Sequence, residues 1–255
     1  MTTQLIYDET FEGWLSCVFE VYERKLSDVS LCSLSCTQSF AFAEVLAVRT
    51  DEQKAARVRK GIEKRLSKEA ANKLSRVWLS EISGIDAVML SYVRYAFDSK
   101  QNIEKDFGHP AVLKIEQTNK MIGREKHRME AFVRFQSTQD GIYYAMVEPD
   151  FDVLPLLIPH FQNRYADQRW LIYDVKRKYG IYYNLQETIT VSIAFGQDTQ
   201  KGTDVSIVFD EKELLYQQLW KQYFKSTNIA SRKNPRLHVQ HMPLRYWKYL
   251  TEKKG

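Results

Sequence analysis

The hydrophobic period of this chain changes near residue 130, and the change limits the folds available to it. Before that point, apolar residues recur at steps of three and four, as Phe11 and Leu15 do, which is typical of a helix with one buried face. After it, short runs of β-branched and aromatic residues follow turn residues, as in 142–147 after Asp140 and Gly141. The pattern predicts an α+β fold with a helical N-terminal part, a central antiparallel sheet with a packed helix, and a helical C-terminus.

Local signals place the expected elements. Ser67 is suited to cap a helix, and Pro110 to begin another that runs on through residue 129. A short helix is expected at 154–164, with Pro155 in its first turn. Strands are expected at 132–135, 142–147, 170–174, 181–183, 188–195 and 204–209. The expected regions are a mainly helical one at 1–122, an antiparallel sheet region at 123–210, and a basic helical tail at 211–255 that packs on the rest, although all three could form one continuous domain.

The composition excludes several classes of protein. Of 255 residues, 44% are hydrophobic and 27% are charged, which is ordinary for a soluble globular chain and excludes a disordered tail, a collagen-like repeat and a membrane protein. The most apolar stretch, Val153–Pro159, is far shorter than the ~20 residues of a membrane span, and no secretory signal is expected. Three cysteines are too few for a disulfide framework, so we expect a reduced, cytoplasmic location.

Charge is distributed unevenly along the chain. Residues 1–31 hold six acids against two bases, residues 49–68 hold eight bases against three acids, and residues 221–255 hold nine bases with Glu252 as the one acid. This asymmetry favours an anionic partner, with nucleic acid as the first candidate. The alternative is that these charges form ordinary solvated helix faces.

The segment 123–135 is the richest in chemistry. Arg124, His127 and Arg128 are spaced to project from one face of a helix, and Arg134 follows on the expected strand. Guanidinium groups bind phosphate or carboxylate oxygens in a bidentate manner, so this face suits a phosphate. The alternative is structural: Arg124 and Arg128 pair with carboxylates such as Glu125 or Glu148 and hold the helix against the sheet.

Acidic residues also gather at the ends of expected strands. Glu148, Asp150 and Asp152 follow one strand, and with Asp174 they make a possible acidic pocket. Carboxylates this close could bind a divalent cation, or an aspartate among them could cap the following helix. The cysteines lack a second ligand pair at zinc spacing, and the chain has no nucleophile elbow or glycine-rich phosphate loop. No metal and no cofactor is therefore expected.

Several long motifs carry a resemblance to a known family. They are LIYDETFEGWLSCVFEVYERK near the start, GREKHRM and EAFVRF at 123–135, YYAMVEPD at 143–150, DVLPLLIPHF at 152–161, NRY at 163–165, DQRWLIYD at 167–174, KR at 176–177, YGIYYN at 179–184, and LWKQYF, NPRL and QHMPLRYWKYL in the tail. In these motifs the chain resembles a bacterial family labelled as probable DNA metabolism proteins. The resemblance covers nearly the whole chain.

The resemblance implies a role in DNA repair or modification, but no particular reaction. Genes of that family lie beside a radical-SAM protein with a helix-hairpin-helix, and in some bacteria the domain is fused to a uracil-DNA glycosylase. This chain departs from the family pattern at Ala131, where a glycine is usual, and at Phe151, where a histidine is frequent. Any role of that histidine is therefore missing here.

The matching motifs, taken residue by residue, outline a candidate nucleic-acid surface. Its members are Arg124, His127, Arg128, Arg134, His160, Arg164, Asp174, Lys176, Arg177, Arg236, His241 and Arg245, with Trp170, Tyr173, Tyr246 and Trp247 as aromatic partners. Bases interleaved with aromatic residues suit single-stranded or flipped nucleotides, because rings stack on bases and cations hold the backbone. Aromatic residues on strands belong more often to the core, and we expect core packing for Trp170.

Three functions fit this sequence. The first is a DNA-associated accessory protein that binds DNA through the basic surface and acts with a radical-SAM or uracil-DNA glycosylase-type partner. The second is a nuclease- or glycosylase-like enzyme that uses the acidic residues with His127 or His160. The third is a protein-binding scaffold whose basic tail docks on an acidic partner. Converging cations, carboxylates around an open position, or an exposed apolar patch beside the tail would separate them.

Overall fold

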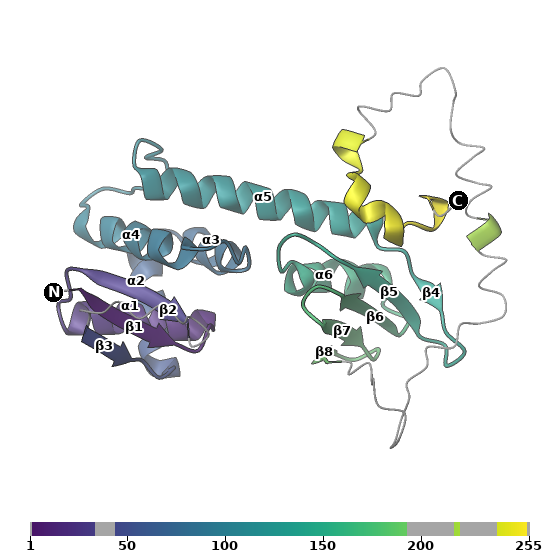
Figure 1. The fold of residues 1–255 in the computed structure, drawn as a ribbon, viewed down its shortest axis with the longest axis horizontal. Helices are drawn as coiled ribbons and strands as arrows, with labels where there is room; N and C mark the ends of the chain where they lie inside the picture. The colour runs from purple at the N-terminus through teal and green to yellow at the C-terminus, as the bar shows by residue number, and fades with distance from the viewer. Residues whose placement is uncertain (1, 34–43, 193–216, 220–238, 254–255) are drawn as a thin grey trace. The chain divides into compact units, whose positions relative to one another are not determined.

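The computed structural model describes residues 2–33, 44–192, 217–219 and 239–253 (Figure 1). They fall in two compact units, 1–122 and 123–255. Each unit contains helices and a sheet, so the predicted α+β class is confirmed. Among the described residues, no helix combines the length and the apolar character that a membrane crossing requires.

Unit 1 contains a parallel sheet that the sequence patterns did not predict. Strand β1 (Thr3–Tyr7) pairs in parallel with β2 (Val29–Ser33) on one side and with β3 (Glu44–Ala47) on the other. Helix α1 (Phe11–Glu23) connects β1 to β2, and a parallel pair needs such a crossover. The central strand β1 is short and buried on both faces, so it shows no alternation that a period of two would reveal. Region 1–122 therefore holds a sheet as well as the predicted helices.

Three more helices of unit 1 follow the sheet: α2 (Glu52–Arg65), α3 (Lys68–Trp78) and α4 (Ile85–Asp98). Thr10, Asp51 and Ser67 cap α1, α2 and α3, because each side chain accepts hydrogen bonds from backbone N–H groups of the first turn. The cap predicted at Ser67 is confirmed. Buried side chains of these helices, such as Trp14 and Leu74, form one core with those of β1.

The described cysteines belong to this core. Cys17 and Cys32 are buried free thiols. Burial raises the pKa of the Cys17 thiol to about 12, with smaller contributions from nearby carboxylates, so this thiol stays protonated at neutral pH. Cys36 lies outside the described residues. No group of three or more potential metal ligands occurs in the described part of the chain.

Helix α5 (Pro110–Phe132) spans the boundary between the two units, which falls after Ile122. Pro110 occupies its first turn as predicted, and the Nδ1 atom of His109 accepts a hydrogen bond from the backbone N–H of Ala111 at 3.2 Å. The helix runs through residue 129 as predicted and continues to Phe132. The strand expected at 132–135 therefore begins later, at Gln136.

The described part of unit 2 contains a five-stranded sheet in the order β4-β5-β6-β7-β8. The strands are β4 (Gln136–Ser137), β5 (Tyr143–Val147), β6 (Trp170–Asp174), β7 (Tyr179–Tyr183) and β8 (Thr188–Val191). The prediction of an antiparallel sheet is wrong for one pair: β5 and β6 run parallel, because α6 (Leu154–Arg164) carries the chain back between them. The other neighbouring strands are antiparallel, as predicted.

Helix α6 packs on the sheet (Figure 1). Pro155 lies in its first turn, and Pro159 is accommodated inside the helix. Trp170 is fully buried against Phe161 of α6 and Tyr183 of β7, with ring centroids 5.9 and 5.5 Å away. The core packing expected of Trp170 is therefore confirmed, and this ring is not available to stack on a base.

The described part of the C-terminal tail is helical. Residues 217–219 and 239–241 are in α-helical conformation, and two 3-10 helices follow, η2 (Leu244–Tyr249) and η3 (Thr251–Lys253). The strand expected at 204–209, the end of the strand expected at 188–195, and Arg236 lie outside the described residues.

Candidate functional site

The candidate site lies where two parallel strands of unit 2 end. Because β5 and β6 are parallel neighbours, their carboxyl ends meet at one edge of the sheet, which is where ligands bind in many α/β proteins. Residues 148–150 follow β5, and residues 175–177 follow β6. A pocket of about 410 Å³ opens there, and η2 supplies three of its residues. The lining residues are Glu148, Pro149, Asp150, Lys176, Leu244, Arg245 and Lys248.

Three cations line this pocket. Lys176 comes from the loop after β6, and Arg245 and Lys248 come from η2. The Nζ atom of Lys176 donates to the carbonyl oxygen of Asp150 at 3.2 Å, so no carboxylate neutralises it in that contact. The Nη2 atom of Arg245 lies 2.7 Å from Oδ2 of Asp150, and Lys248 donates to the carboxylate of Glu148. Three cations against two carboxylates leave the lining with a positive charge, and the side chains of Arg245 and Lys248 are 40% and 57% exposed.

Arg245 and Lys248 stand on the same side of η2 for a geometric reason. A 3-10 helix has three residues per turn, so side chains three positions apart lie above one another. In an α-helix the same spacing would leave them offset by a fraction of a turn. The 3-10 conformation therefore brings both cations to the pocket.

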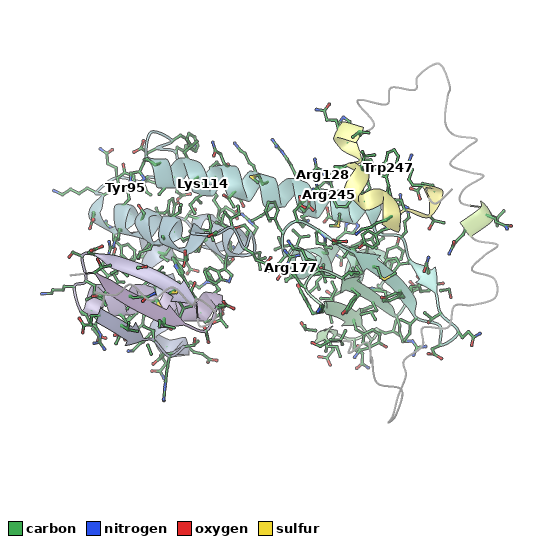
Figure 2. All side chains as sticks on the ribbon, in the orientation of Figure 1. Tyr95, Lys114, Arg128, Arg177, Arg245 and Trp247 are labelled. Atoms are coloured by element: carbon green, nitrogen blue, oxygen red, sulfur yellow. The ribbon has the colours of Figure 1, made fainter. Side chains whose placement is uncertain are left out.

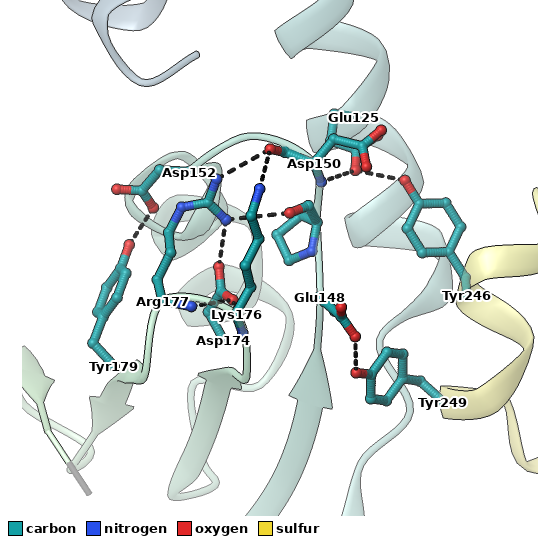
Figure 3. Close-up of polar contacts among 11 residues, drawn as sticks. Glu125, Glu148, Asp150, Asp152, Asp174, Lys176, Arg177, Tyr179, Tyr246 and Tyr249 are labelled. Atoms are coloured by element: carbon teal, nitrogen blue, oxygen red, sulfur yellow. Dashed lines mark hydrogen bonds and ion pairs between the residues drawn. The ribbon is translucent and has the colours of Figure 1, made fainter. Parts of the chain in front are cut away.

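Asp174 holds the loops behind the pocket together (Figure 3). Its carboxylate is fully buried, and Oδ1 accepts hydrogen bonds from the backbone N–H groups of Lys176 at 2.9 Å and Arg177 at 3.1 Å. Oδ2 accepts from Nη1 of Arg177 at 2.8 Å. The same guanidinium donates to the carbonyl oxygens of Pro149 and Asp150 at 3.2 and 3.1 Å, which joins the loop after β6 to the loop after β5.

Glu125 of α5 is the second buried carboxylate at the site, with a side chain only 1% exposed. Its Oε1 accepts from the backbone N–H of Asp150 at 2.9 Å and from the hydroxyl of Tyr246 at 2.5 Å (Figure 3). Its Oε2 lies 3.1 Å from Arg245 and 3.7 Å from Arg128, which come from η2 and α5 (Figure 2). Burial, strengthened by the hydrogen bond to Glu125, raises the pKa of Tyr246. Glu125 thus joins α5, the loop after β5 and η2.

Glu148 is held in its charged form. It accepts hydrogen bonds from Lys248 and, at 2.6 Å, from the hydroxyl of Tyr249. These two bonds lower the pKa of Glu148, with the bond from Lys248 the larger cause. Burial and the bond to Glu148 raise the pKa of Tyr249 to about 12. Glu148 therefore acts here as a partner for two tail residues.

The four acidic residues do not form one open pocket. Glu148 and Asp150 line the pocket, whereas Asp174 is buried and Asp152 accepts a hydrogen bond from the hydroxyl of Tyr179. Each of the four has a donor from the protein within hydrogen-bond or ion-pair distance. Carboxylates satisfied in this way are suited to holding structure, because a metal or substrate would have to displace those donors.

The predicted basic residues divide into two groups. In the first, each basic side chain is at most 40% exposed and lies within ion-pair distance of a carboxylate: Arg128 and Arg245 with Glu125, Arg134 with Glu252 at 2.9 Å, His160 with Glu130 at 3.8 Å, and Arg177 with Asp174. The structural alternative considered for 123–135 therefore describes the contact of Arg128.

The second group is exposed. Arg124 is exposed on α5, and no carboxylate among the described residues lies within ion-pair distance of it. His127 is 85% exposed, 3.8 Å from Glu130. Arg164 lies over the ring of Tyr165 at 5.8 Å, and His241 is exposed. These residues remain candidates for contact with a ligand.

The aromatic candidates are mostly covered by the protein itself. Tyr173 and Tyr246 are each only 2% exposed. Trp247 is partly exposed, but its indole N–H donates to the carbonyl oxygen of Met242 at 3.0 Å and Lys253 lies 4.7 Å from its ring centroid. Of Tyr173, Tyr246 and Trp247, only Trp247 is exposed enough to stack on a base.

Sequence reasoning missed Leu244, Lys248 and Tyr249. All three lie in the tail motif QHMPLRYWKYL, but the motif does not show which conformation the tail adopts. A spacing of three residues puts Arg245 and Lys248 on one side of either type of helix, but only the tertiary structure shows that this side lines the pocket. The one available signal was the spacing of three between these cations.

Comparison with known proteins places this site in a family. No curated protein matches the chain. A family model described as a domain of unknown function, DUF4130, matches residues 83–252, about two thirds of the chain, and this range includes every residue of the pocket. Residues 1–82, which hold the parallel sheet and α1 to α3, precede the match. The chain therefore belongs to the DUF4130 family of uncharacterised domains.

Proposed function

We propose that this protein is a DNA-associated accessory protein of DNA repair or modification that binds DNA through the basic surface around the pocket of unit 2. The observation that supports this most directly is the convergence of Lys176, Arg245 and Lys248 on one pocket. Cations that gather in this way attract phosphate groups and release counterions from the DNA. Composition agrees, since residues 123–255 carry 20 Lys and Arg against 15 Asp and Glu, while residues 1–122 carry 17 of each.

Binding of this kind supplies affinity without reading sequence. Lys and Arg contacts to phosphate position the protein on the nucleic acid, whereas base-edge contacts would be needed for specificity. In the proposal, the pocket holds one phosphate, and the exposed Arg124 and His127 of α5 extend the contact along the backbone. Arg177 and Asp174 act as positioning residues, because they hold the two loops that carry the lining side chains.

The enzyme alternative has less support. A nuclease- or glycosylase-like mechanism would need a carboxylate or histidine open to substrate, but each of the four acidic candidates already accepts from a protein donor. Its histidine candidates, His127 and His160, each lie 3.8 Å from the carboxylate of Glu130. We therefore place the chemistry in a partner, a radical-SAM or uracil-DNA glycosylase-type protein in the cytoplasm, on the strength of the sequence resemblance.

DNA binding measured by fluorescence anisotropy over a salt series tests the proposal. The wild-type chain should bind at low salt, with log affinity falling linearly against log salt. Lys176→Gln and Lys248→Gln should each reduce the slope by about one and weaken every sequence alike. Lys114→Gln, an exposed residue of α5 in unit 1, is the matched control and should leave the slope unchanged. Absence of wild-type binding at low salt would refute the proposal.

A further inference from the structure

Unit 1 contains an aromatic groove that no part of the proposed function uses. Its volume is about 400 Å³, and three rings line it: Phe19 and Tyr22 from α1, and Phe97 from α4. The ring centroids of Tyr22 and Phe97 are 5.2 Å apart, and Tyr22 is 38% exposed. Helix α2 contributes Arg57, Val58 and Gly61 to the lining. The groove is therefore open and largely apolar, with three aromatic rings in its lining.

Two arginines of α2 contact aromatic residues that line this groove. Arg57, Gly61 and Arg65 recur at steps of four along α2, so they share one face of the helix, and the two arginines are about 12 Å apart along its axis. The guanidinium of Arg57 lies 5.0 Å from the centroid of Phe19, and Nη2 of Arg65 donates to the carbonyl oxygen of Phe97 at 3.1 Å. Within the described residues, no carboxylate lies within ion-pair distance of either arginine.

The other charges at the groove agree with an anionic ligand. Glu23 is the one acidic residue that lines it, and its carboxylate lies 4.0 Å from the ammonium of Lys54. Lys60 and Lys64 are exposed on α2, and no carboxylate in the described ranges lies within ion-pair distance of them. Arg57, which lines the groove, and the exposed cations that follow it on α2 are therefore available to an anionic ligand.

Gly61 lines the groove beside Phe97. A Cβ atom at this position would lie 3.4 Å from Cζ of Phe97, and only atoms of Phe97 lie within 4 Å of it. A glycine inside a helix costs roughly 1 kcal/mol relative to alanine. A side chain at this position would therefore begin in contact with Phe97, one of the rings that line the groove.

We infer that this groove binds single-stranded nucleic acid, with a base stacked against Tyr22 and Phe97 and with backbone phosphates at Arg57 and Arg65. Aromatic rings combined with cations along a groove are the features by which proteins hold unpaired strands. A duplex keeps its bases paired and stacked inside, so it cannot present them to an apolar groove. The inference goes beyond the proposed function, because the groove lies in unit 1 and six of its seven lining residues precede the family match.

The test compares two substitutions of Gly61. Gly61→Leu fills the groove with an aliphatic side chain, and Gly61→Ala adds only the Cβ atom. Anisotropy is measured with a fluorescein-labelled oligothymidylate of about 12 nucleotides and with a duplex of similar length. We expect Gly61→Leu to weaken binding of the oligothymidylate by about fivefold or more, the effect of one lost stacked base, while duplex binding is unchanged. Gly61→Ala should bind both probes like the wild type.

A second pair of variants tests the phosphate contacts. Arg57→Gln combined with Arg65→Gln should reduce the slope of log affinity against log salt for the oligothymidylate by about 1.4, since each phosphate on a single strand contributes about 0.7. Lys114→Gln, at an exposed position of α5, serves as the control. Circular dichroism confirms that each variant is folded.

The outcomes separate this inference from the proposed function. If Gly61→Leu and the double arginine variant bind the oligothymidylate like the wild type, while Lys176→Gln and Lys248→Gln weaken it, the groove inference is wrong and the proposed function stands. If only the groove variants lose binding, the proposed role of the unit 2 pocket is wrong. Wild-type binding of the duplex but not of the oligothymidylate also overturns the inference, and so does equal weakening of both probes by Gly61→Leu.

Discussion

Both units of this protein join two parallel strands through a helix, but they differ in what surrounds the strand ends. In unit 1 the helix is α1, between β1 and β2, and in unit 2 it is α6, between β5 and β6. Residues 1–122 are balanced in charge, with 17 bases and 17 acids, whereas residues 123–255 carry 20 bases and 15 acids. The shared topology thus places loops in similar positions, and the residues on those loops decide what the site can bind.

An aspartate holds the strand ends in each unit. In unit 1, Asp8 follows β1 and accepts from the backbone N–H and hydroxyl of Thr10, at 3.1 and 2.7 Å, and from the hydroxyl of Thr50 beyond β3, at 2.6 Å. These hydrogen bonds lower the pKa of Asp8. In unit 2, Asp174 instead accepts from the cationic Arg177 and is fully buried. The side-chain donors to Asp8 are therefore neutral hydroxyls, whereas the side-chain donor to Asp174 is a cationic guanidinium.

The two aspartates should therefore differ in their effect on stability. Asp174→Ala removes a buried carboxylate that accepts from a guanidinium and from two backbone N–H groups, and we expect it to lower the free energy of unfolding by about 3–5 kcal/mol. Asp8→Ala removes a more exposed carboxylate with neutral partners, so we expect a loss of about 1 kcal/mol. Urea unfolding followed by circular dichroism measures both. Equal losses would show that burial and charge do not distinguish the sites.

Glycine substitutions test how tightly Asp8 is packed. A Cβ atom at Gly13 would lie 2.2 Å from Oδ1 of Asp8, so Gly13→Ala forces this side chain to move. We expect a loss of about 1–3 kcal/mol in the free energy of unfolding. Gly123→Ala is the matched control inside α5, where nothing lies within 4 Å, and it should raise stability by up to about 1 kcal/mol. A stable Gly13→Ala variant would mean that Asp8 does not hold the strand ends.

Acid should reduce the stability of the protein in part by protonating one glutamate in each unit. A hydrogen bond from Lys54 lowers the pKa of Glu20, and one from Lys248 lowers the pKa of Glu148, each from an ordinary value of 4.5. Because the folded-state pKa is lowered, each group stabilises the fold above its ordinary pKa, and this contribution is lost as pH falls through the lowered value. The side chain of Glu20 is 9% exposed and that of Glu148 is 36% exposed, so we expect the larger effect at Glu20.

The measurement for this comparison is urea unfolding at neutral pH and at about pH 3, below both ordinary values. Glu20→Gln should flatten the fall in stability with acid more than Glu148→Gln does. The wild type should lose stability over this range, and each glutamine variant should lose less. If Glu148→Gln flattened the fall in stability more than Glu20→Gln did, the argument that the less exposed glutamate contributes more would be wrong.

The smallest expected change in stability is the difference between substitutions of two arginines of α5. Arg124 is exposed, so Arg124→Ala should leave the melting temperature unchanged and, under the proposed function, reduce the salt slope of DNA binding by about one. Arg128 lies 3.7 Å from the buried Glu125, so Arg128→Ala should cost about 1 kcal/mol of stability and change the slope less. Thermal unfolding and anisotropy on the same samples distinguish the two. A stability loss at Arg124 with an unchanged slope would assign it a structural role.

Local sequence signals predicted the elements that short-range physics controls. The helices at Phe11–Glu23 and Leu154–Arg164 and the strand at Trp170–Asp174 follow from apolar spacing and from proline at a helix start. The cap at Ser67 follows from a side chain that bonds three residues ahead. Each of these features depends on neighbours within a few residues, and a sequence displays such neighbours directly.

Tertiary structure alone decided the site. Glu125 contacts Arg245 and Tyr246 across 120 and 121 residues of chain, and Glu148 contacts Lys248 across 100, distances over which hydrophobic period carries no information. The parallel pairing of β5 with β6 depends on a crossover, and it determines which loops meet. By itself, the sequence determined the α+β class, several of the helices and the supply of arginines. Packing decided which arginines lie beside buried carboxylates and which remain open to a ligand. The reason is that the partners of an ion pair can be far apart in the sequence and come within a few ångströms only when the chain folds.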